Sequence, residues 1–193
     1  MLDIRLASTA ADLRAVYRFR YAVYVEEMNR PQKHADHESK LIIDSLDVPS
    51  AYVLAAWDAG ELVGTVRNNF LRSCDIGEYA RQYALTGFSP EFLAAASITT
   101  RLMVHPRYRC TTLATRLSCA AYRGGLERGI TTDFIDCNRH LVGYFAGLGY
   151  RRHRDNLVHP EYGVVTVMRL DLTDHSHLEA IRSPFRRTLR ARG

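Results

Sequence analysis

The sequence has few cysteines and no apolar run long enough to cross a bilayer. Its 193 residues include four cysteines, and no two of them form a C-x-x-C pair. Scattered single cysteines do not build a zinc site or a disulfide framework, and a transmembrane helix needs about 20 consecutive apolar residues. The first residues also lack the basic and then apolar layout of a signal peptide. We therefore expect a cytoplasmic protein, in a reducing compartment, without an integral membrane segment.

Positive charge is in excess, with a formal net charge of +5 and a pI near 9.2. Much of it lies in the last dozen residues, at Arg182, Arg186, Arg187, Arg190 and Arg192. Such a segment suits nucleic acid, an anionic membrane surface or an acidic protein, and it also suits a solvated terminal helix. No recognised nucleic-acid motif accompanies it, so we expect no nucleic-acid partner.

The 47% of hydrophobic residues predicts a folded domain with a sizeable core. We expect one domain over residues 1–173, followed by a basic, partly helical tail over residues 174–193.

The pattern of the remaining chain predicts a mixed sheet flanked by helices. Strands are expected at Leu2–Leu6, 51–57, 61–70, 97–104, 132–137 and 163–172. Helices are expected over residues 10–28, 78–84, from Ser89, 113–126 and 138–148. Apolar residues at Leu13, Val16, Tyr17, Tyr21, Tyr24 and Val25 share one face of the first helix, and Phe19 lies off that face. This order is typical of an α/β or α+β fold.

One stretch, from Ser97 to Leu126, organises the rest. It reads as a buried strand, a loop with two arginines (Arg107 and Arg109), and an amphipathic helix. The first turn of a helix has backbone N–H groups without intrahelical partners, and the helix dipole adds positive charge there. The loop therefore suits a pyrophosphate or a phosphopantetheine. An ordinary strand–loop–helix corner with solvated arginines explains the same pattern equally well.

The residues of this stretch, VHPRYRCTTLATRL, resemble the acyl-donor motif of the GNAT superfamily of N-acyltransferases. That resemblance implies a GNAT-like fold, with a mixed, mostly antiparallel central sheet flanked by helices. It also implies that loop N–H groups hold the donor's pyrophosphate. Thr112 stands where the family has glycine, which narrows the space for a pyrophosphate. The residues expected to bind the donor are Met103, Val104, Arg109, Cys110, Thr111, Thr112, Leu113, Ala114 and Asn138.

A later segment, from Asn138 to Tyr150, resembles another GNAT motif, N-x-x-A-x-x-x-Y-x-x-x-G-F. In the family its tyrosine often protonates the leaving thiolate. Here Phe145 takes that position and Tyr144 stands beside it. Phe145 has no proton to donate, so the resemblance implies that another residue or solvent protonates the leaving group.

The N-terminal half narrows the branch of the superfamily. Its segment RFRYAVYVEE, the pair Asp44-x-x-Asp47, the strand GTVR and Thr100-Arg101 resemble acyl-homoserine-lactone synthases and long-chain N-acyl amino acid synthases. Lactone synthases carry a glutamate where this chain has Ile98, which argues against the adenosylmethionine-using branch. The resemblance implies transfer of a medium- or long-chain acyl group to an amino acid or peptide amine. Two other classes stay open, an acetyl-coenzyme A-dependent acetyltransferase and a non-catalytic basic module.

The catalytic candidates follow from the chemistry of an amine attacking a thioester. Carboxylates can bind an ammonium or take its proton, and Glu27, Asp44 and Asp47 are the candidates. Arg67 and Arg101 can hold an acceptor carboxylate bidentately. The resemblance adds a backbone N–H near Met103 or Val104 as donor to the thioester oxygen. The alternative for the aspartates is a turn, and for the arginines a structural ion pair with those aspartates.

The expected donor is an acyl carrier protein thioester or acyl-coenzyme A, with no metal. Carrier proteins are acidic, so basic side chains could form a docking patch or simply a solvated face; these are Arg107, Arg109, Arg151, Arg152 and Arg154. The loop NRPQKHADHESK contains His34, Asp36, His37 and Glu38. Such a local cluster is more often a solvated loop than a metal site.

Overall fold

The structure is a computed structural model that describes residues 1–159 and 161–190; the tail arginine Arg192 lies outside the described residues. Its strands are β1 (Asp3–Leu6), β2 (Ala35–Asp36), β3 (Leu41–Ile42), β4 (Tyr52–Asp58), β5 (Glu61–Phe70), β6 (Ala96–Val104), β7 (Thr132–Asn138), β8 (Arg151–His159) and β9 (Gly163–Asp171). Its α-helices are α1 (Ala10–Tyr21), α2 (Glu78–Gln82), α3 (Pro90–Ala94), α4 (Leu113–Glu127), α5 (Val142–Leu148), α6 (His175–Ala180) and α7 (Arg186–Arg190). Short π or 3₁₀ turns are η1 (Ala22–Glu27), η2 (Pro106–Tyr108) and η3 (Arg139–Leu141).

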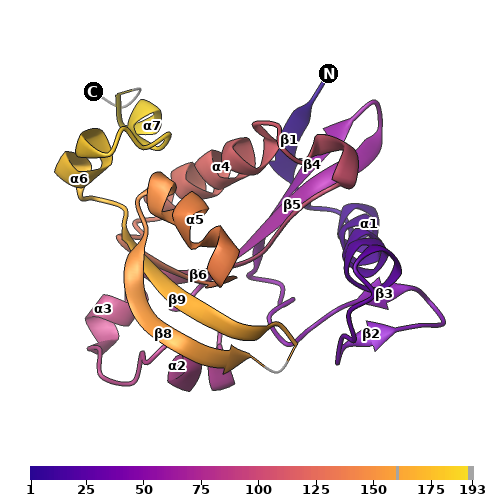
Figure 1. The fold of residues 1–193 in the computed structure, drawn as a ribbon, viewed down its shortest axis with the longest axis horizontal. Helices are drawn as coiled ribbons and strands as arrows, with labels where there is room; N and C mark the ends of the chain where they lie inside the picture. Colours follow the sequence, from indigo (N-terminus) through magenta and orange to yellow (C-terminus); the bar gives the residue numbers. More distant parts are fainter. Residues whose placement is uncertain (160, 191–193) are drawn as a thin grey trace.

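Seven strands form one mixed sheet in the order β1-β4-β5-β6-β7-β9-β8 (Figure 1). Within the described residues every neighbouring pair is antiparallel except β6 and β7. A parallel pair needs a crossover connection, and helix α4 supplies it between these two strands. The predicted mixed, mostly antiparallel sheet flanked by helices is confirmed.

The parallel strands β6 and β7 stay together over a short distance and then part. Their register runs from Ala96 opposite Thr132 to Ile98 opposite Phe134. Beyond Ile98, β6 continues to Val104 paired with β5, and β7 continues paired with β9. A gap therefore opens between the C-terminal halves of two central strands, and the candidate site is built around it.

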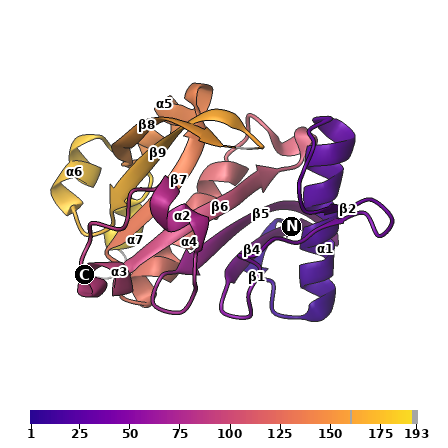
Figure 2. The same cartoon turned by 90° about the horizontal axis from the view of Figure 1, so that it is seen from below.

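Helices cover both faces of the sheet, because side chains of the strands alternate between the faces. On β4, Val53 and Ala55 pack with Val16 of α1. Their neighbour Leu54 packs instead against α4, where it meets Leu117. Figure 2 shows α1, α2 and α3 in front of the sheet and α4 behind it. The result is a three-layer arrangement with separate cores on the two faces.

Two expectations about local structure were wrong. The first helix is not continuous over 10–28: α1 ends at Tyr21 and a π-helix follows over Ala22–Glu27. Wider π turns rotate the later side chains relative to the α-helical pattern. Phe19 precedes these turns; it lies off the face that carries Leu13 and Val16, and it is buried in a separate cluster with Val23 and Met103. Strand β8 was not anticipated, because its sequence RRHRDNLVH is mostly polar, as suits the exposed strand at the end of the sheet.

The segment after β9 packs on the domain as far as the structure describes it. Leu178 and Phe185 are buried, and the Phe185 ring stacks on Tyr122 of α4 at 4.4 Å between centroids. Figure 1 shows α6 and α7 beside the end of α4. These contacts bury apolar surface from a segment whose sequence is dominated by polar and basic residues.

Close packing of α4 on β4 gives a test of the fold. A Cβ at Gly124 would lie 2.6 Å from a ring carbon of Tyr52, whereas one at Gly147 of α5 meets nothing within 4 Å. We expect Gly124→Ala to lower the free energy of unfolding by about 1–3 kcal/mol through overpacking. The control Gly147→Ala should raise it by about 0.5 kcal/mol. Urea denaturation of both variants measures the difference; equal stabilities would contradict this packing.

Candidate active site

Three arginines and two aspartates form a buried cluster beside the gap, between α1 and the sheet. Arg20 comes from α1, Arg67 from β5 and Arg101 from β6, while Asp44 and Asp47 lie on the loop after β3. We call these five residues the arginine–aspartate cluster. Each arginine is at most 6% exposed in its side chain, and Arg20 and Arg67 are fully buried. Four separate segments of the chain therefore meet at one charged centre.

The aspartates bridge the arginines. Asp47 accepts from Arg20 Nη1 at 2.7 Å and lies 2.7 Å from Arg67 Nη1. Asp44 accepts from Arg67 Nη1 at 2.6 Å and from Arg101 Nη2 at 2.8 Å. The two aspartates also fix each other, because the Asp44 N–H donates to Asp47 Oδ2 at 2.9 Å. The ion pairs considered as an alternative for these residues are thus present, and a turn joins the two carboxylates.

The arginine–aspartate cluster carries one more positive than negative charge. Burial alone would raise the pKa of Asp44, but the charges and hydrogen bonds of Arg67 and Arg101 hold this pKa well below its usual range. Burial lowers the pKa of Arg20. Within the described residues, Nε and Nη2 of Arg20 have no hydrogen-bond partner. A buried unpaired charge is costly, so the cluster is suited to receive an anion.

Arg101 is the member of the cluster that lies on β6 beyond Ile98, where β6 is no longer paired with β7. It has a positive φ of 56°, and the register of β5 and β6 shifts beside it. Such bulges re-aim side chains. Its Nη1 donates to Tyr162 Oη at 2.5 Å and to Gln32 Oε1 at 3.1 Å, and its guanidinium lies 5.2 Å from the Tyr24 ring centre. Arg101 thus joins the ion cluster to three polar side chains from other segments.

The backbone of β6 places one N–H group in the gap. The His105 N–H donates to the carbonyl of Val63 on the β5 side at 2.8 Å. Successive residues of a strand direct their N–H groups to opposite sides. The Val104 N–H therefore points away from β5, toward the space between β6 and β7, whereas the Met103 N–H points toward β5. Val104 is thus the geometrically suitable residue of the two candidates for contacting a thioester oxygen.

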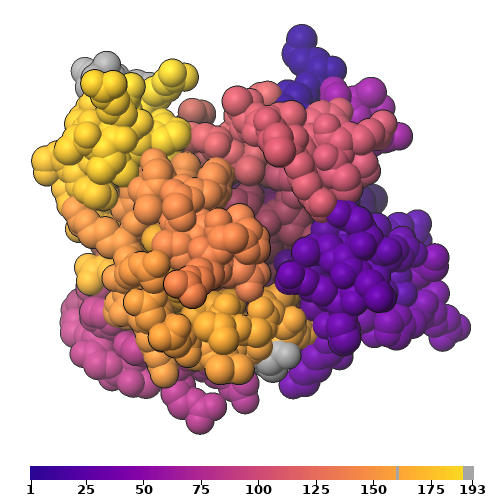
Figure 3. Space-filling view, in the orientation of Figure 1, coloured from indigo at the N-terminus to yellow at the C-terminus, as the bar shows by residue number. Residues whose placement is uncertain are grey.

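The expected donor loop lies where β6 leads into α4, and its arginines are paired. Arg109 lies 2.5 Å from Glu27 at the end of the π-helix, and Arg107 lies 2.7 Å from Glu61. Cys110 is exposed with a positive φ of 59°. Exposed ion pairs are weak, so a phosphate could replace either carboxylate. Figure 3 shows the surface hollowed where α4, α5 and the N-terminal helical segment meet, in front of the central strands.

The other expected donor residues have distinct surroundings. Thr111 Oγ1 donates to the Tyr108 carbonyl and accepts from the Leu113 N–H, and Thr112 is the N-cap residue of α4. The Leu113 side chain is buried in the core and the Leu113 N–H donates to Thr111 Oγ1, and Ala114 follows it in the first turn. Asn138, at the end of β7, donates to the carbonyl of Tyr162 in the β8–β9 turn at 2.9 Å.

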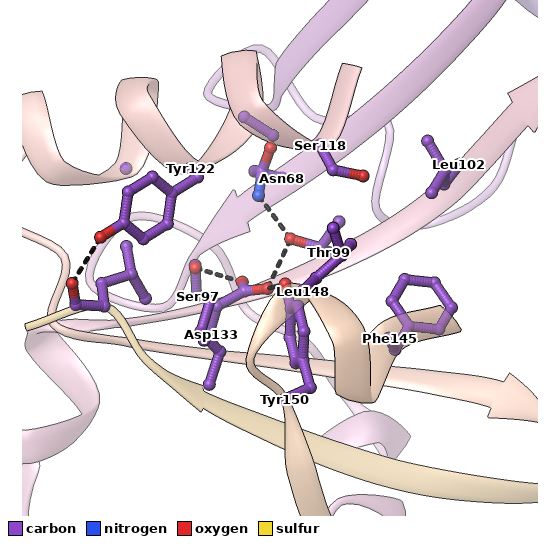
Figure 4. A pocket seen from close by; sticks show the side chains of 14 residues that line it. Asn68, Ser97, Thr99, Leu102, Ser118, Tyr122, Asp133, Phe145, Leu148 and Tyr150 are labelled. Carbon is purple, nitrogen blue, oxygen red and sulfur yellow. Dashed lines mark hydrogen bonds between the residues drawn. The ribbon is translucent and has the colours of Figure 1, made fainter. Parts of the chain in front are cut away.

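A narrow cavity of about 20 Å³ lies between the sheet and helices α4 and α5 (Figure 4). Its polar wall is centred on Asp133, which is 4% exposed. Ser97, Thr99 and Tyr150 all donate hydrogen bonds to the Asp133 carboxylate. The opposite wall is apolar and includes Phe145, which occupies the position of the family's tyrosine. No sequence motif identified this cavity, since its lining comes from six separate elements: β5, β6, α4, β7, α5 and β9.

The buried Asp133 predicts a measurable pH dependence. Burial raises its pKa to about 6, against hydrogen bonds from Ser97, Tyr150 and Thr99. The folded protein thus binds the carboxyl proton of Asp133 more tightly than the unfolded chain does. This proton binding stabilises the folded state fully below about pH 4, and the stabilisation is lost as the pH rises toward 6. We expect the free energy of unfolding of the wild type, measured relative to Asp133→Asn, to fall by about 3 kcal/mol from pH 4 to pH 6. Urea denaturation at several pH values checks it; a difference that grows with pH would contradict it.

The five arginines expected to form a docking patch lie on two parts of the molecule. Arg107 and Arg109 follow β6, whereas the other three are on β8, separated from β6 by β7 and β9. Arg151 pairs with Asp174, Arg152 pairs with Asp155, and Arg154 donates to main-chain carbonyls. Their positive charge is therefore largely engaged by this chain's own groups.

The loop with His34 and His37 is held by local contacts. The His37 Nδ1 lies 2.9 Å from Tyr21 Oη, and Asp36 accepts from the N–H groups of Glu38 and Ser39. Within the part of the chain that the structure describes, no three His, Cys, Asp or Glu side chains are placed to share a metal ion. Over the same residues, no helix combines the length and apolar character needed to span a bilayer.

Four residues of the site were not identified from the sequence: Arg20, Tyr24, Gln32 and Tyr162. Arg20 and Tyr24 were read as parts of an ordinary amphipathic helix, and Gln32 as part of a polar loop. An arginine within an aromatic-rich helical stripe was the available signal for Arg20, since a buried arginine requires a partner. Tyr162 gave no signal, because it reaches Arg101 from a turn 61 positions away in the sequence.

Solved structures with the same architecture cover nearly the whole chain. The structure of FeeM, an N-acyl amino acid synthase from uncultured soil microbes, superposes with a TM-score of 0.72 over 97% of this chain and 98% of that chain, at 14% identity. BjaI, a coenzyme A-dependent acyl-homoserine lactone synthase solved with SAM and isopentyl-CoA, gives 0.71 over 95% and 90%, at 18% identity. The structure of a putative N-acetyltransferase from Lactobacillus plantarum gives 0.65 over 89% and 98%, at 17% identity. The fold is that of the GNAT-like acyltransferases.

The family assignment comes from the sequence match. The model of the family described as N-acyl amino acid synthase FeeM matches residues 15–171. The chain therefore belongs to the FeeM family of N-acyl amino acid synthases, which confirms the resemblance found in the sequence and the acyltransferase class. A curated relative, L-ornithine N(alpha)-acyltransferase of Rhodobacter capsulatus, is 47% identical over 45 residues. That match spans 23% of this chain and 17% of the length of the relative.

Proposed function

We propose that this protein transfers a medium- or long-chain acyl group from a phosphopantetheine thioester to the amine of an amino acid. The observation that carries the proposal is the arginine–aspartate cluster, with one uncompensated positive charge, beside the gap between β6 and β7. Arg101 is the member we assign to the acceptor carboxylate, because it adjoins the opening of the sheet. A guanidinium binds a carboxylate in a bidentate manner, which also orients the amine of the same molecule.

The proposed reaction forms an amide and releases a thiol. The neutral amine attacks the thioester carbonyl carbon, and the oxygen gains negative charge that the Val104 N–H stabilises. The C–S bond then breaks, the thiolate leaves and takes a proton, and the nitrogen loses one. Asp47 has no exposed surface and Asp44 is held by two arginines, so we assign both to positioning those arginines. Glu27, which is partly exposed, is the carboxylate we propose for accepting the amine's proton.

The donor arm is proposed to lie along the loop from Arg109 to Ala114 and the first turn of α4, with Asn138 on the opposite strand. We propose an acyl carrier protein as the donor's carrier rather than coenzyme A. Thr112 in place of glycine and the Arg109–Glu27 ion pair both weaken a pyrophosphate site, whereas the net charge of +5 favours an acidic partner. The four free cysteines support a reducing, cytoplasmic setting.

Mass-spectrometric detection of product tests the proposal. The purified protein is offered acyl groups of several lengths, on carrier protein and on coenzyme A, together with a pool of amino acids. The expected result is a long-chain N-acyl amino acid, formed faster from the carrier protein. Faster reaction with acyl-coenzyme A would overturn the carrier assignment alone. Acetyl transfer only, or no product from a folded protein, would overturn the proposed function.

A further inference from the structure

The cavity between the sheet and helices α4 and α5 contains a polar group that an unsubstituted acyl chain cannot satisfy. Its sheet side carries hydroxyl, carboxyl and amide groups. Its helix side carries leucine, alanine and aromatic side chains and Ser118, whose hydroxyl donates to the Ala114 carbonyl. The cavity lies beside the paired part of β6 and β7, next to the point where the two strands part and the gap begins. On the proposed function, an acyl chain entering through the gap would extend toward this cavity. The inference below rests on that function for the route of the chain.

Hydrogen bonds fix the orientation of the Asn68 side chain. The Thr99 hydroxyl donates its single proton to Asp133 Oδ2 at 2.7 Å. Thr99 Oγ1 must therefore accept from its other neighbour, and the amide nitrogen of Asn68 donates to it at 2.5 Å. The amide oxygen of Asn68 then faces away from Thr99, toward α4 (Figure 4). This side chain is 4% exposed, and within the described residues its Oδ1 accepts no hydrogen bond.

A buried acceptor without a donor is unfavourable. A methylene group placed against Asn68 Oδ1 leaves it unsatisfied, and a keto group brings a second acceptor. An ammonium group would supply a donor at the cost of burying a charge beside apolar side chains. A hydroxyl group supplies a donor without a charge. The cavity holds about one water molecule in its present shape, so an entering chain must also push the apolar side chains apart.

The position of Asn68 sets where on the chain this hydroxyl must lie. Asn68 is opposite Thr99 in the register of β5 and β6. Val104 is five residues further along β6, which at about 3.3 Å per residue is roughly 16 Å, or the length of an extended chain of roughly twelve carbons. A hydroxyl near the thioester would be far from Asn68. The group must therefore lie near the distal end of the chain.

We propose that this protein selects acyl donors that carry a hydroxyl group near the distal end of the chain, and that Asn68 Oδ1 accepts the hydrogen bond from this group. Asn68 acts as a specificity residue, while Ser97, Thr99, Asp133 and Tyr150 hold its amide in the required orientation. The substrate class is thus an ω-hydroxylated medium-chain acyl thioester.

Competition between matched donors tests this specificity. Dodecanoyl, ω-hydroxydodecanoyl and β-hydroxydodecanoyl thioesters are offered together, and ratios of kcat/KM are measured. We expect the ω-hydroxy donor to be preferred over the plain donor by about tenfold, with no such preference for the β-hydroxy donor. Asn68→Ala should bring the ratio close to one. Asn69→Ala is the matched control, because Asn69 is equally buried but donates to the Leu46 carbonyl, outside the cavity, and it should keep the wild-type ratio.

A binding measurement separates this inference from the proposed function. The thermal shift caused by free ω-hydroxydodecanoic acid is compared with that caused by dodecanoic acid, in wild type and in both variants. A larger shift with the hydroxy acid that Asn68→Ala abolishes would support the inference even where no product forms. Equal donor rates in the wild type, or a ratio unchanged in Asn68→Ala, would overturn it. So would equal thermal shifts when no donor reacts.

Discussion

Replacing Asp47 by asparagine is expected to lower the free energy of unfolding by about 3–5 kcal/mol, the range found when one partner of a buried ion pair is removed. Asp47 lies between Arg20 and Arg67, and all three side chains are fully buried. The variant would leave a second positive charge without a counter-charge in a cluster that already has one in excess. For a small domain such a loss is a large share of the total stability.

Urea denaturation measures this effect, and an exposed ion pair supplies the control. Lys40 and Glu26 lie 2.8 Å apart, with side chains that are 62% and 48% exposed. Glu26→Gln should therefore change the free energy of unfolding by less than about 1 kcal/mol. If Asp47→Asn proves as mild as this control, the charges of the arginine–aspartate cluster do not hold α1 and its loop against the sheet.

The second large effect is expected at Arg101, on the rate of acyl transfer. Arg101→Lys keeps the positive charge, so an ion pair with Asp44 can persist, but it loses the planar, bidentate geometry. It also cannot reproduce the present contacts with Tyr162 and Gln32. We expect kcat/KM for the amino acid to fall about 100-fold, mostly through KM, because charge-assisted bidentate bonds of this kind are worth about 2–3 kcal/mol.

Measuring KM for both substrates shows whether the Arg101→Lys variant affects binding of the amino acid alone. The KM for the acyl donor should stay within about twofold of the wild-type value, because a lysine in place of Arg101 would still leave the donor loop intact. The control Arg151→Lys alters an exposed arginine paired with Asp174, and should leave both KM values unchanged. An Arg101→Lys variant with an unchanged acceptor KM, or with both KM values raised together, would contradict the assigned role.

Much of the fold could be read along the chain, because its signals are local. The hairpin of β4 and β5, the strand β6 and helix α4 follow apolar periodicities of two and about 3.6 residues, and these are properties of short windows. The donor loop was located for the same reason, since proline ends the strand and the amphipathic pattern begins soon after it. The strand β8 was missed because an exposed, arginine-rich strand carries little alternation.

The site was only partly predictable, because its geometry depends on residues far apart in sequence. Asp44, Asp47, Arg67 and Arg101 were identified as a candidate set, but the roles of the two aspartates could not be separated. Only the fold shows that Asp47 lies between two arginines, while Arg101 pairs with Asp44 and also reaches Tyr162 and Gln32. Arg20 was not among the candidates, because its contact with Asp47 joins positions that are 27 residues apart in the sequence.

The sequence alone determined the family of this protein, most of the order of its elements and the position of the proposed donor loop, because each is encoded in contiguous residues. The tertiary structure decided which residues lie next to each other. It brought a third arginine to the two aspartates, directed the Val104 N–H into the gap, and enclosed Asp133 and Asn68 in one cavity. Such features arise from the register of strands and the packing of distant segments, and burial then sets the charge balance and pKa values that the chemistry depends on.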